Sequence, residues 1–340
     1  MIVVMAAHAT ELQIQDVEKR IQDWGYGVHP IYGSERTVIG AVGVPEADKA
    51  RYMESLESLP HVEQVIAILR PYKFASRDFR AENTVIDVKG VLIGGNQIAM
   101  MAGPCTVETY EQTWESAQAC KAAGATILRG GAYKPSTSPY SFHGLGVEGL
   151  KILKDIGDKL DMRVITEVMD LRNVELVCEY ADILQIGTRN MQNYDLLREV
   201  GKVKTPVMLK RGMSSKIEEW LQAAEYILLG GNPNVMLCER GIRTFETITR
   251  NTLDLSAVPA VKELTHLPVI VDPSQGTGKR SLVMALTKAA VAVGADGLII
   301  EVHPHPEQAI KDGAQSLTCE NFTQLMRELK PVAEAIGRTL

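Results

Sequence analysis

Basic side chains stand directly after several short apolar runs in the second part of the chain. The positions are Arg129, Lys134, Arg189, Lys210, Arg211 and Arg240. If the runs are strands of one parallel barrel, their carboxyl ends meet on one rim and these side chains converge there. Cations held together repel one another, so the phosphate and carboxylate groups of a substrate would suit them as counterions. The pattern predicts a pocket for a small, multiply anionic substrate; the alternative is that each cation is a surface charge or belongs to a structural ion pair.

A second group of residues expected on this rim has the chemistry of metal ligands. Cys105 follows the first apolar run, Glu301 follows the last, and Asp312 comes shortly after it, with Gln275 or His303 as a further candidate. A thiolate with carboxylates suits a divalent transition ion such as Mn²⁺, Fe²⁺ or Zn²⁺. These residues are far apart in the sequence, and Cys105 could also be a small buried hydrophobe.

The elements that must position these side chains are eight apolar runs, each followed by a helical pattern. They span residues 98–102, 126–128, 163–166, 183–186, 206–209, 235–237, 268–271 and 297–300. Nearly continuous apolarity is typical of strands buried on both faces. Eight such units predict a (β/α)8 TIM barrel over residues 98–340. The alternative is an open doubly wound sheet, but no GxGxxG follows an early strand.

Residues 1–97 show a different order of predicted secondary-structure elements. Residues 1–70 give the order strand, helix, strand, strand, helix, strand, which is typical of a ferredoxin-like α+β domain. Residues 71–97 read as a charged linker followed by a β-hairpin whose turn is Lys89-Gly90. We therefore expect a small N-terminal domain, a linker with a hairpin, and a barrel.

Composition narrows the classes of protein. With 36 Lys and Arg against 42 Asp and Glu, the net charge of −6 argues against a nucleic acid or an acidic membrane as partner. The five cysteines show no CxxC spacing, which favours reduced thiols over a disulfide framework. We find no signal peptide and no long apolar run, so we expect a cytoplasmic protein.

Nine segments together resemble 3-deoxy-D-arabino-heptulosonate 7-phosphate (DAHP) synthase, in the branch with an N-terminal ferredoxin-like regulatory domain. They are 102–105 (AGPC), 128–135 (LRGGAYKP), 165–168 (ITEV), 185–187 (QIG), 189–191 (RNM), 209–212 (LKRG), 238–241 (CERG), 271–274 (VDPS) and 301–304 (EVHP). The chain is also similar to 3-deoxy-D-manno-octulosonate 8-phosphate synthase, but Pro135 after Lys134 favours the DAHP branch.

The resemblance implies a transferase that condenses phosphoenolpyruvate with an aldose phosphate, erythrose 4-phosphate in this family, and releases inorganic phosphate. This is the first step of the shikimate pathway to aromatic amino acids. It implies Lys134, Glu167 and Cys105 as catalytic residues. The implied substrate-binding residues are Arg129, Lys134, Ser136, Thr137, Thr188, Arg189, Lys210 and Arg240, and the implied metal ligands are Cys105, Gln275, Glu301 and Asp312.

Four positions depart from the family pattern around the expected pocket. Gln275 stands where a ligating His is usual, which should weaken binding of a divalent metal. Ser136 replaces an Arg that normally helps to bind the acceptor phosphate, and a hydroxyl is no substitute for a bidentate guanidinium. His143 and Thr188 replace Gln and Ala. Four changes around one pocket favour re-tuning over drift.

Two further readings of the resemblance stay open at this point. The chain could be a paralogue that uses a different aldehyde acceptor, or a non-catalytic relative that binds an anion or effector. The resemblance also implies a homotetramer and an aromatic amino-acid effector at the N-terminal domain.

Overall fold

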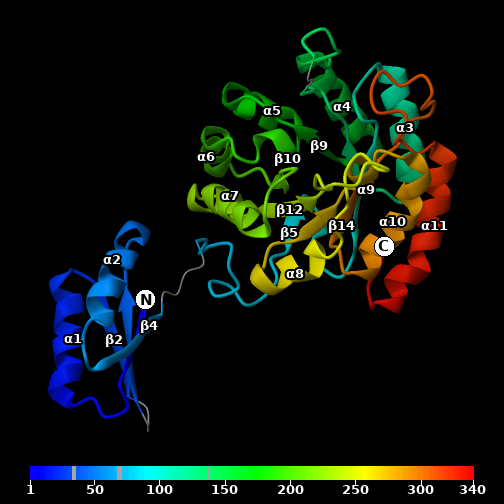
Figure 1. The fold of residues 1–340 in the computed structure, drawn as a ribbon. Helices are drawn as coiled ribbons and strands as arrows, with labels where there is room; N and C mark the ends of the chain where they lie inside the picture. Colours follow the sequence, from blue (N-terminus) through cyan, green and yellow to red (C-terminus); the bar gives the residue numbers. More distant parts are fainter. Residues whose placement is uncertain (33–35, 67–70, 136–137) are drawn as a thin grey trace. The chain divides into compact units, whose positions relative to one another are not determined.

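The computed structural model describes residues 1–32, 36–66, 71–135 and 138–340, and the chain forms two compact units, Met1–Pro71 and Tyr72–Leu340 (Figure 1). In the first unit, strands β1 (Ile2–Met5), β2 (Gly27–Tyr32), β3 (Thr37–Val42) and β4 (Val62–Ile66) form an antiparallel sheet in the order β2-β3-β1-β4. Helix α1 (Glu11–Asp23) connects β1 to β2, and helix α2 (Glu46–Glu57) connects β3 to β4. Together they form the predicted ferredoxin-like unit.

The start of helix α1 illustrates how local sequence sets these elements. The Thr10 hydroxyl accepts a hydrogen bond from the Gln13 backbone N–H at 3.4 Å, and the Gln13 side chain accepts one from the Thr10 N–H at 2.8 Å. This reciprocal arrangement satisfies two of the donors that every helix leaves open at its N-terminus. One face of the helix then buries Ile14, Val17 and Ile21 in the core of the unit.

The second unit is the predicted TIM barrel. Its eight parallel strands close in a ring: β7 (Ala99–Gly103), β8 (Ile127–Arg129), β9 (Arg163–Glu167), β10 (Ile183–Ile186), β11 (Val207–Lys210), β12 (Val235–Glu239), β13 (Val269–Val271) and β14 (Gly297–Glu301). Residues in all eight strands are buried, with one partly exposed exception at Arg163. This burial explains the continuous apolar runs.

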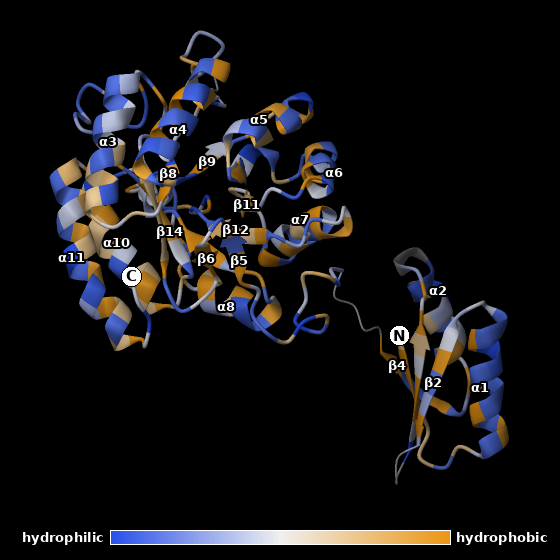
Figure 2. Ribbon diagram, turned by 180° about the vertical axis from the view of Figure 1, so that it is seen from behind, coloured by the Kyte–Doolittle hydropathy of each residue, from blue (hydrophilic) through white to orange (hydrophobic). Residues whose placement is uncertain are grey.

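Helices surround the barrel, and their residues alternate between apolar and polar character (Figure 2). The helices are α3 (Tyr110–Ala122), α4 (Val147–Leu160), α5 (Val174–Tyr180), α6 (Tyr194–Lys202), α7 (Ile217–Leu229), α8 (Ala257–Leu264), α9 (Pro273–Thr277), α10 (Arg280–Ala292) and α11 (Cys319–Ala335), with short 3₁₀ helices at Leu171–Asn173 and Thr188–Asn190. Their apolar faces pack against the strands. Within the described residues, no helix is long and apolar enough to cross a membrane.

A hairpin lies against the amino-terminal end of the barrel. Strands β5 (Ile86–Val88) and β6 (Val91–Ile93) pair antiparallel, and both turn residues, Lys89 and Gly90, have positive φ. The buried side chains of Ile86, Val88 and Ile93 join one apolar cluster with side chains from inside the barrel. The hairpin therefore closes this end of the barrel and leaves the carboxyl ends of the strands for chemistry.

We expect Ile93→Ala to lower the free energy of unfolding by about 2–5 kcal/mol, because it leaves a cavity in this cluster. Leu92 is the matched control, since its side chain is about half exposed on the other face of the same strand. Leu92→Ala should change the free energy of unfolding by about 0.5 kcal/mol or less. Urea unfolding of both variants checks this, and equal losses would show that the hairpin does not seal the barrel.

Candidate active site

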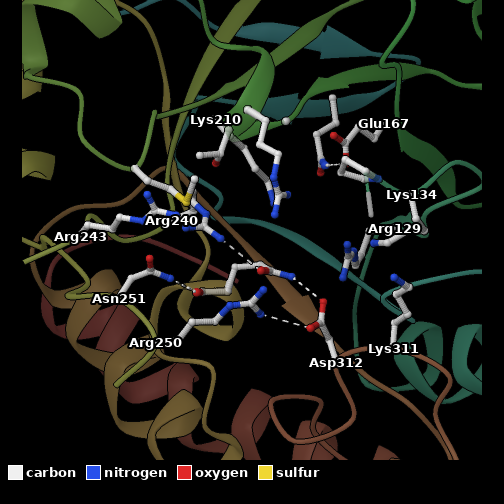
Figure 3. Close-up of a pocket in the computed structure, with 17 residues that line it drawn as sticks. Arg129, Lys134, Glu167, Lys210, Arg240, Arg243, Arg250, Asn251, Lys311 and Asp312 are labelled. Atoms are coloured by element: carbon white, nitrogen blue, oxygen red, sulfur yellow. Dashed lines mark hydrogen bonds and ion pairs between the residues drawn. The ribbon is translucent and has the colours of Figure 1, made fainter. Parts of the chain in front are cut away.

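A pocket of about 310 Å³ opens at the carboxyl ends of the barrel strands (Figure 3). Its lining is strongly basic. The charged lining residues are Arg129, Lys134, Arg189, Lys210, Arg240, Arg243, Arg250 and Lys311, with Glu167 and Asp312 as the acids. Such a lining fits a small ligand that carries several negative charges.

All five predicted cations of the substrate clamp line this pocket. Arg129 ends β8 and Lys134 follows it, Arg189 and Thr188 lie in the 3₁₀ helix after β10, Lys210 ends β11, and Arg240 follows β12. The convergence arises because neighbouring parallel strands bring their carboxyl ends to one rim. Of the other predicted substrate-binding residues, Ser136 and Thr137 lie outside the described residues.

Two of these cations already have a carboxylate partner inside the barrel. The Lys210 Nζ lies 2.7 Å from Asp272 Oδ2, and the Arg129 Nη1 lies 2.9 Å from Glu301 Oε1. Burial alone would raise the pKa of Asp272, but Lys210 and Arg129 outweigh it and hold that pKa below its usual value. These pairs fix both cations in position and leave their remaining donors available.

Arg240 has no such partner. Its side chain is 7% exposed, its Nη1 is buried without a hydrogen bond, and no carboxylate of the described chain lies within 4 Å of it. Burial lowers the pKa of its guanidinium, although Asp272 opposes this. The Nε of Arg129 is also buried and unbonded. Buried cationic donors without partners are costly, so this part of the pocket calls for an anion.

Glu167 sits among the cations at the end of β9. Its carboxylate is buried and accepts a hydrogen bond from Gln185 Nε2 at 3.3 Å. It packs over Gly187, where an added Cβ would lie 2.0 Å from Glu167 Oε1. Burial raises the pKa of Glu167, with Lys134, Lys210 and Arg129 acting in the opposite direction. A buried carboxyl group held beside several cations is placed to exchange a proton with a bound water or substrate.

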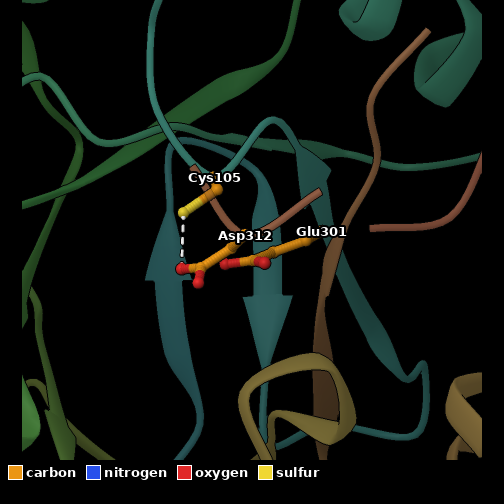
Figure 4. A group of neighbouring side chains, drawn as sticks. All are labelled: Cys105, Glu301 and Asp312. Carbon is orange, nitrogen blue, oxygen red and sulfur yellow. Dashed lines mark hydrogen bonds between the residues drawn. The ribbon is translucent and has the colours of Figure 1, made fainter. Parts of the chain in front are cut away.

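Three of the predicted metal ligands form a compact cluster (Figure 4). One ligand atom each of Cys105, Glu301 and Asp312 lies within 4.8 Å of the others. The barrel assembles the cluster by closing: β14 pairs with β7, which sets Glu301 opposite Gly103, two residues before Cys105. Asp312 arrives on the loop after β14, where its carbonyl accepts a hydrogen bond from the Ser316 hydroxyl at 3.1 Å.

The Cys105 thiol lies between a carboxylate and an ammonium group. It donates to Asp312 Oδ2 at 3.2 Å, and Lys134 Nζ lies 3.1 Å from its sulfur and 3.0 Å from its carbonyl oxygen. Burial raises the pKa of Cys105, and the charge of Glu301 adds to the effect. Burial alone would lower the pKa of Lys134, but Cys105 and Glu301 outweigh it and the pKa is raised, so Lys134 is an ammonium ion here.

Gln275, the fourth predicted ligand, joins this cluster through its nitrogen. Its Nε2 donates to Glu301 Oε1 at 2.9 Å and to Asp312 Oδ2 at 3.2 Å. Its Oε1 accepts from Arg240 Nη2 at 3.2 Å. The hydrogen-bond network fixes this assignment. A flipped amide would place its NH₂ group against the donors of Arg240 and its oxygen against the carboxylate oxygens of Glu301 and Asp312. The oxygen that a metal would need therefore points towards Arg240.

Other residues named from the sequence lie elsewhere. Arg211 turns away from the pocket, with its Nη1 2.9 Å from both Glu239 Oε2 and Asp254 Oδ2. His303 faces Glu108, with 3.6 Å between Nε2 and Oε2. His143 is exposed, and its Nε2 lies 3.1 Å from the carbonyl oxygen of Pro139.

Sequence reasoning missed several lining residues: Gln185, Met213, Arg243, Arg250, Asn251 and Lys311. Arg243, Arg250 and Asn251 come from the long segment between β12 and α8, and Lys311 directly precedes Asp312. The basic residues of the segment between β12 and α8 were the feature of the sequence that could have pointed to them. A loop that follows a strand of a barrel reaches the same rim as the strand end.

Comparison with known proteins agrees with this architecture. Residues 80–337 match the family described as DAHP synthetase I family, and residues 1–70 match the DAHP synthase ferredoxin-like domain. A relative from Thermotoga maritima, phospho-2-dehydro-3-deoxyheptonate aldolase, is 50% identical over 337 residues, which is 99% of both chains. A 2-dehydro-3-deoxyphosphooctonate aldolase from Geobacter sulfurreducens is 30% identical over 73% of this chain and 97% of its own length.

Solved structures give the same result. The crystal structure of the DAHP synthase from Thermotoga maritima superposes with a TM-score of 0.81 at 49% identity, over 99% of this chain and 98% of that one. A truncated form of the enzyme from that organism gives a TM-score of 0.75 at 49% identity, over 79% of this chain and 98% of its own.

Proposed function

The chain belongs to the DAHP synthetase I family, and from that premise we propose how its pocket carries out the family reaction. The enzyme is a transferase that condenses phosphoenolpyruvate with an aldose phosphate in the shikimate pathway. The acceptor we assign is erythrose 4-phosphate. The observation that supports phosphoenolpyruvate as the ligand of the pocket is Arg240, a buried cation whose Nη1 is unbonded and which pairs with no carboxylate of the described residues.

Five cations hold phosphoenolpyruvate in this proposal. Arg129, Lys134, Arg189, Lys210 and Arg240 bind its phosphate and carboxylate groups. The unbonded donors of Arg129 and Arg240 then gain the anionic acceptors that the described part of the chain does not provide. Because most of these cations are already fixed by neighbours, little rearrangement accompanies binding.

The chemical step joins C3 of phosphoenolpyruvate to the aldehyde carbon of the acceptor. As the C–C bond forms, the aldehyde oxygen gains negative charge. Lys134, an ammonium ion beside Cys105, stabilises that charge and donates a proton to the oxygen, and the proton later taken from water restores the ammonium ion. Water then adds at C2, and phosphate leaves with cleavage of its C–O bond. Glu167 positions this water and accepts its proton, a role that suits a buried carboxyl surrounded by cations.

The family is generally metal-dependent, and three residues of this chain fit a divalent ion. Cys105, Glu301 and Asp312 would hold it, and their thiolate and carboxylate donors suit Mn²⁺, Fe²⁺ or Zn²⁺. Such an ion supplies Lewis-acid polarisation of the acceptor aldehyde when it is bound. The carboxamide of Gln275 presents nitrogen to this site, so it adds no ligand in the arrangement described.

The direct test measures release of inorganic phosphate from phosphoenolpyruvate in the presence of erythrose 4-phosphate, with and without added Mn²⁺, Fe²⁺ or Zn²⁺. We expect release that depends on the acceptor. A panel of other aldoses and aldose phosphates, including acceptors without a terminal phosphate, follows in the same assay. Absence of phosphate release with every acceptor and metal would refute the proposal.

Ser136 is the position that bears on acceptor choice, because the family pattern has an Arg there. We expect Ser136→Arg to lower the KM for erythrose 4-phosphate by about tenfold, since a guanidinium binds phosphate through two hydrogen bonds. The KM for phosphoenolpyruvate should not change. Steady-state kinetics with a non-phosphorylated acceptor provide the control, and an equal gain there would show that position 136 does not contact the acceptor phosphate. If the native acceptor lacks this phosphate, the alternative of a re-tuned paralogue holds.

We extend the proposal to the regulation and assembly of the enzyme. The ferredoxin-like unit suggests an effector site, and we propose an aromatic amino acid as the effector and a homotetramer as the working form. We also propose a cytoplasmic location. Inhibition of the full chain by Tyr or Phe, together with light scattering after size exclusion, tests the first two. Equal sensitivity in a chain that begins at residue 72 would remove the N-terminal unit as the effector site.

A further inference from the structure

The carboxamide of Gln275 joins two carboxylates that belong to the proposed metal centre. One N–H group of its Nε2 faces Glu301 Oε1 at 2.9 Å, and the other faces Asp312 Oδ2 at 3.2 Å. Two carboxylates so close together repel each other unless something positive stands between them. The amide hydrogens of Gln275 supply that positive charge between the two carboxylates.

Hydrogen bonds fix both the backbone of Gln275 and its side-chain amide. The backbone N–H donates to Asp272 Oδ1 at 2.9 Å and the backbone carbonyl oxygen accepts from Asn251 Nδ2 at 3.1 Å, while the side-chain Oε1 accepts from Arg240 Nη2 at 3.2 Å. Arg240 has donors only. To offer Oε1 to a metal, Gln275 would have to turn its NH₂ group towards that guanidinium. The side chain is therefore built as a hydrogen-bond donor to the carboxylates.

The carboxylate oxygens that a metal would use are already engaged. Glu301 Oε1 is shared by Gln275 and by Arg129 Nη1 at 2.9 Å, and Glu301 Oε2 accepts from Gln315 Nε2 at 2.7 Å. Asp312 Oδ2 is shared by Gln275 and the Cys105 thiol, and its Oδ1 faces Arg250 Nη1 at 3.1 Å. The cluster is thus satisfied by hydrogen bonds and ion pairs within the protein.

We propose that Gln275 competes with the metal for Glu301 and Asp312, and so acts as an internal cross-link of the site and not as a ligand. This inference rests on the metal centre proposed above. A metal that takes Glu301 Oε1 and Asp312 Oδ2 has to displace both hydrogen bonds from the amide, so its binding is weakened and readily reversed. The cross-link in turn keeps Glu301 and Asp312 in place when the metal leaves.

The test compares Co²⁺ binding by the full chain and three variants after removal of metals with a chelator. A cobalt–thiolate absorption band reports binding at Cys105, and Cys105→Ser should abolish it. We expect Gln275→Leu to bind Co²⁺ about tenfold more tightly than the unchanged chain, the factor expected when one or two competing hydrogen bonds are lost. Gln275→His should bind more tightly still, because it also adds an imidazole ligand.

The direction of the change in Co²⁺ affinity in Gln275→Leu tells a competitor from a ligand. A ligand that is removed weakens binding, whereas a competitor that is removed strengthens it, so an unchanged or weaker affinity would overturn the inference. Gln275→Ala provides the same comparison if the leucine variant does not fold. If no form of the chain, Gln275→His included, binds Co²⁺, both the inference and the proposed metal centre fail. Phosphate release by the unchanged chain is measured separately and tests the reaction by itself.

Discussion

Replacing Arg240 with alanine should lower kcat/KM for phosphoenolpyruvate by about a hundred- to a thousandfold, the usual cost of removing one fixed electrostatic contact from an active site. It should leave the free energy of unfolding within about 1 kcal/mol of the original value. Both expectations come from one observation. Arg240 is buried and its Nη1 has no hydrogen bond. Among the described residues its guanidinium donates to the Gln275 amide oxygen and pairs with no carboxylate, so the folded protein gains little from it before the substrate binds.

Steady-state kinetics and urea unfolding measure the two effects. Arg240→Lys should recover part of the activity, since it restores the charge but not the paired geometry of a guanidinium. Arg163→Ala is the matched control: Arg163 begins β9 at the opposite end of the barrel and pairs with Asp161 at 2.7 Å. If Arg240→Ala keeps kcat/KM within threefold, Arg240 does not hold phosphoenolpyruvate.

Replacing Arg211 with alanine should have the opposite profile, with a loss of about 3–5 kcal/mol in the free energy of unfolding. Arg211 is as buried as Arg240, but its Nη1 lies 2.9 Å from both Glu239 Oε2 and Asp254 Oδ2. Glu239 is fully buried, and burial raises its pKa against the pull of Arg211. Without Arg211, an uncompensated carboxylate remains in the barrel wall.

The stability of a double variant separates this cause from a simple packing defect. Arg211→Met with Glu239→Leu removes both charges and keeps most of the volume, so it should recover much of the lost stability. Kinetic constants of Arg211→Ala, measured well below its unfolding temperature, should stay near the original values because Arg211 does not line the pocket. A loss in the free energy of unfolding below about 1 kcal/mol would show that the ion pairs of Arg211 are not structural.

The two arginines also mark the limit of reading the site from sequence. Lys210 and Arg211 are neighbours after one strand, and both were expected on the basic rim. Successive side chains of an extended chain point to opposite sides, so only one of the two can face the pocket. The pattern does not say which. The structure assigns Lys210 to the pocket beside Asp272 and Arg211 to the wall beside Glu239.

The sequence alone predicted the fold and the chemical character of the site. Eight buried runs fit a closed barrel or an open doubly wound sheet, and the lack of a GxGxxG motif favoured the barrel. The basic residues at the ends of the runs predicted an anionic substrate, because parallel strands share one rim. The same reasoning placed Cys105, Glu301 and Asp312 together, although they are distant in the chain. The ring closure that pairs β14 with β7 is the physical reason for their contact.

Only the tertiary structure decided how the side chains are paired. Gln275 was expected as a weak metal ligand, but whether its oxygen or its nitrogen faces Glu301 depends on Arg240, which reaches it from the next strand round the barrel. Arg243, Arg250 and Lys311 likewise join the pocket because of where their loops run. Local patterns fix which elements form and where their ends meet. Hydrogen-bond partners are chosen by competition among groups brought together from many strands, and that competition takes place only in the folded chain.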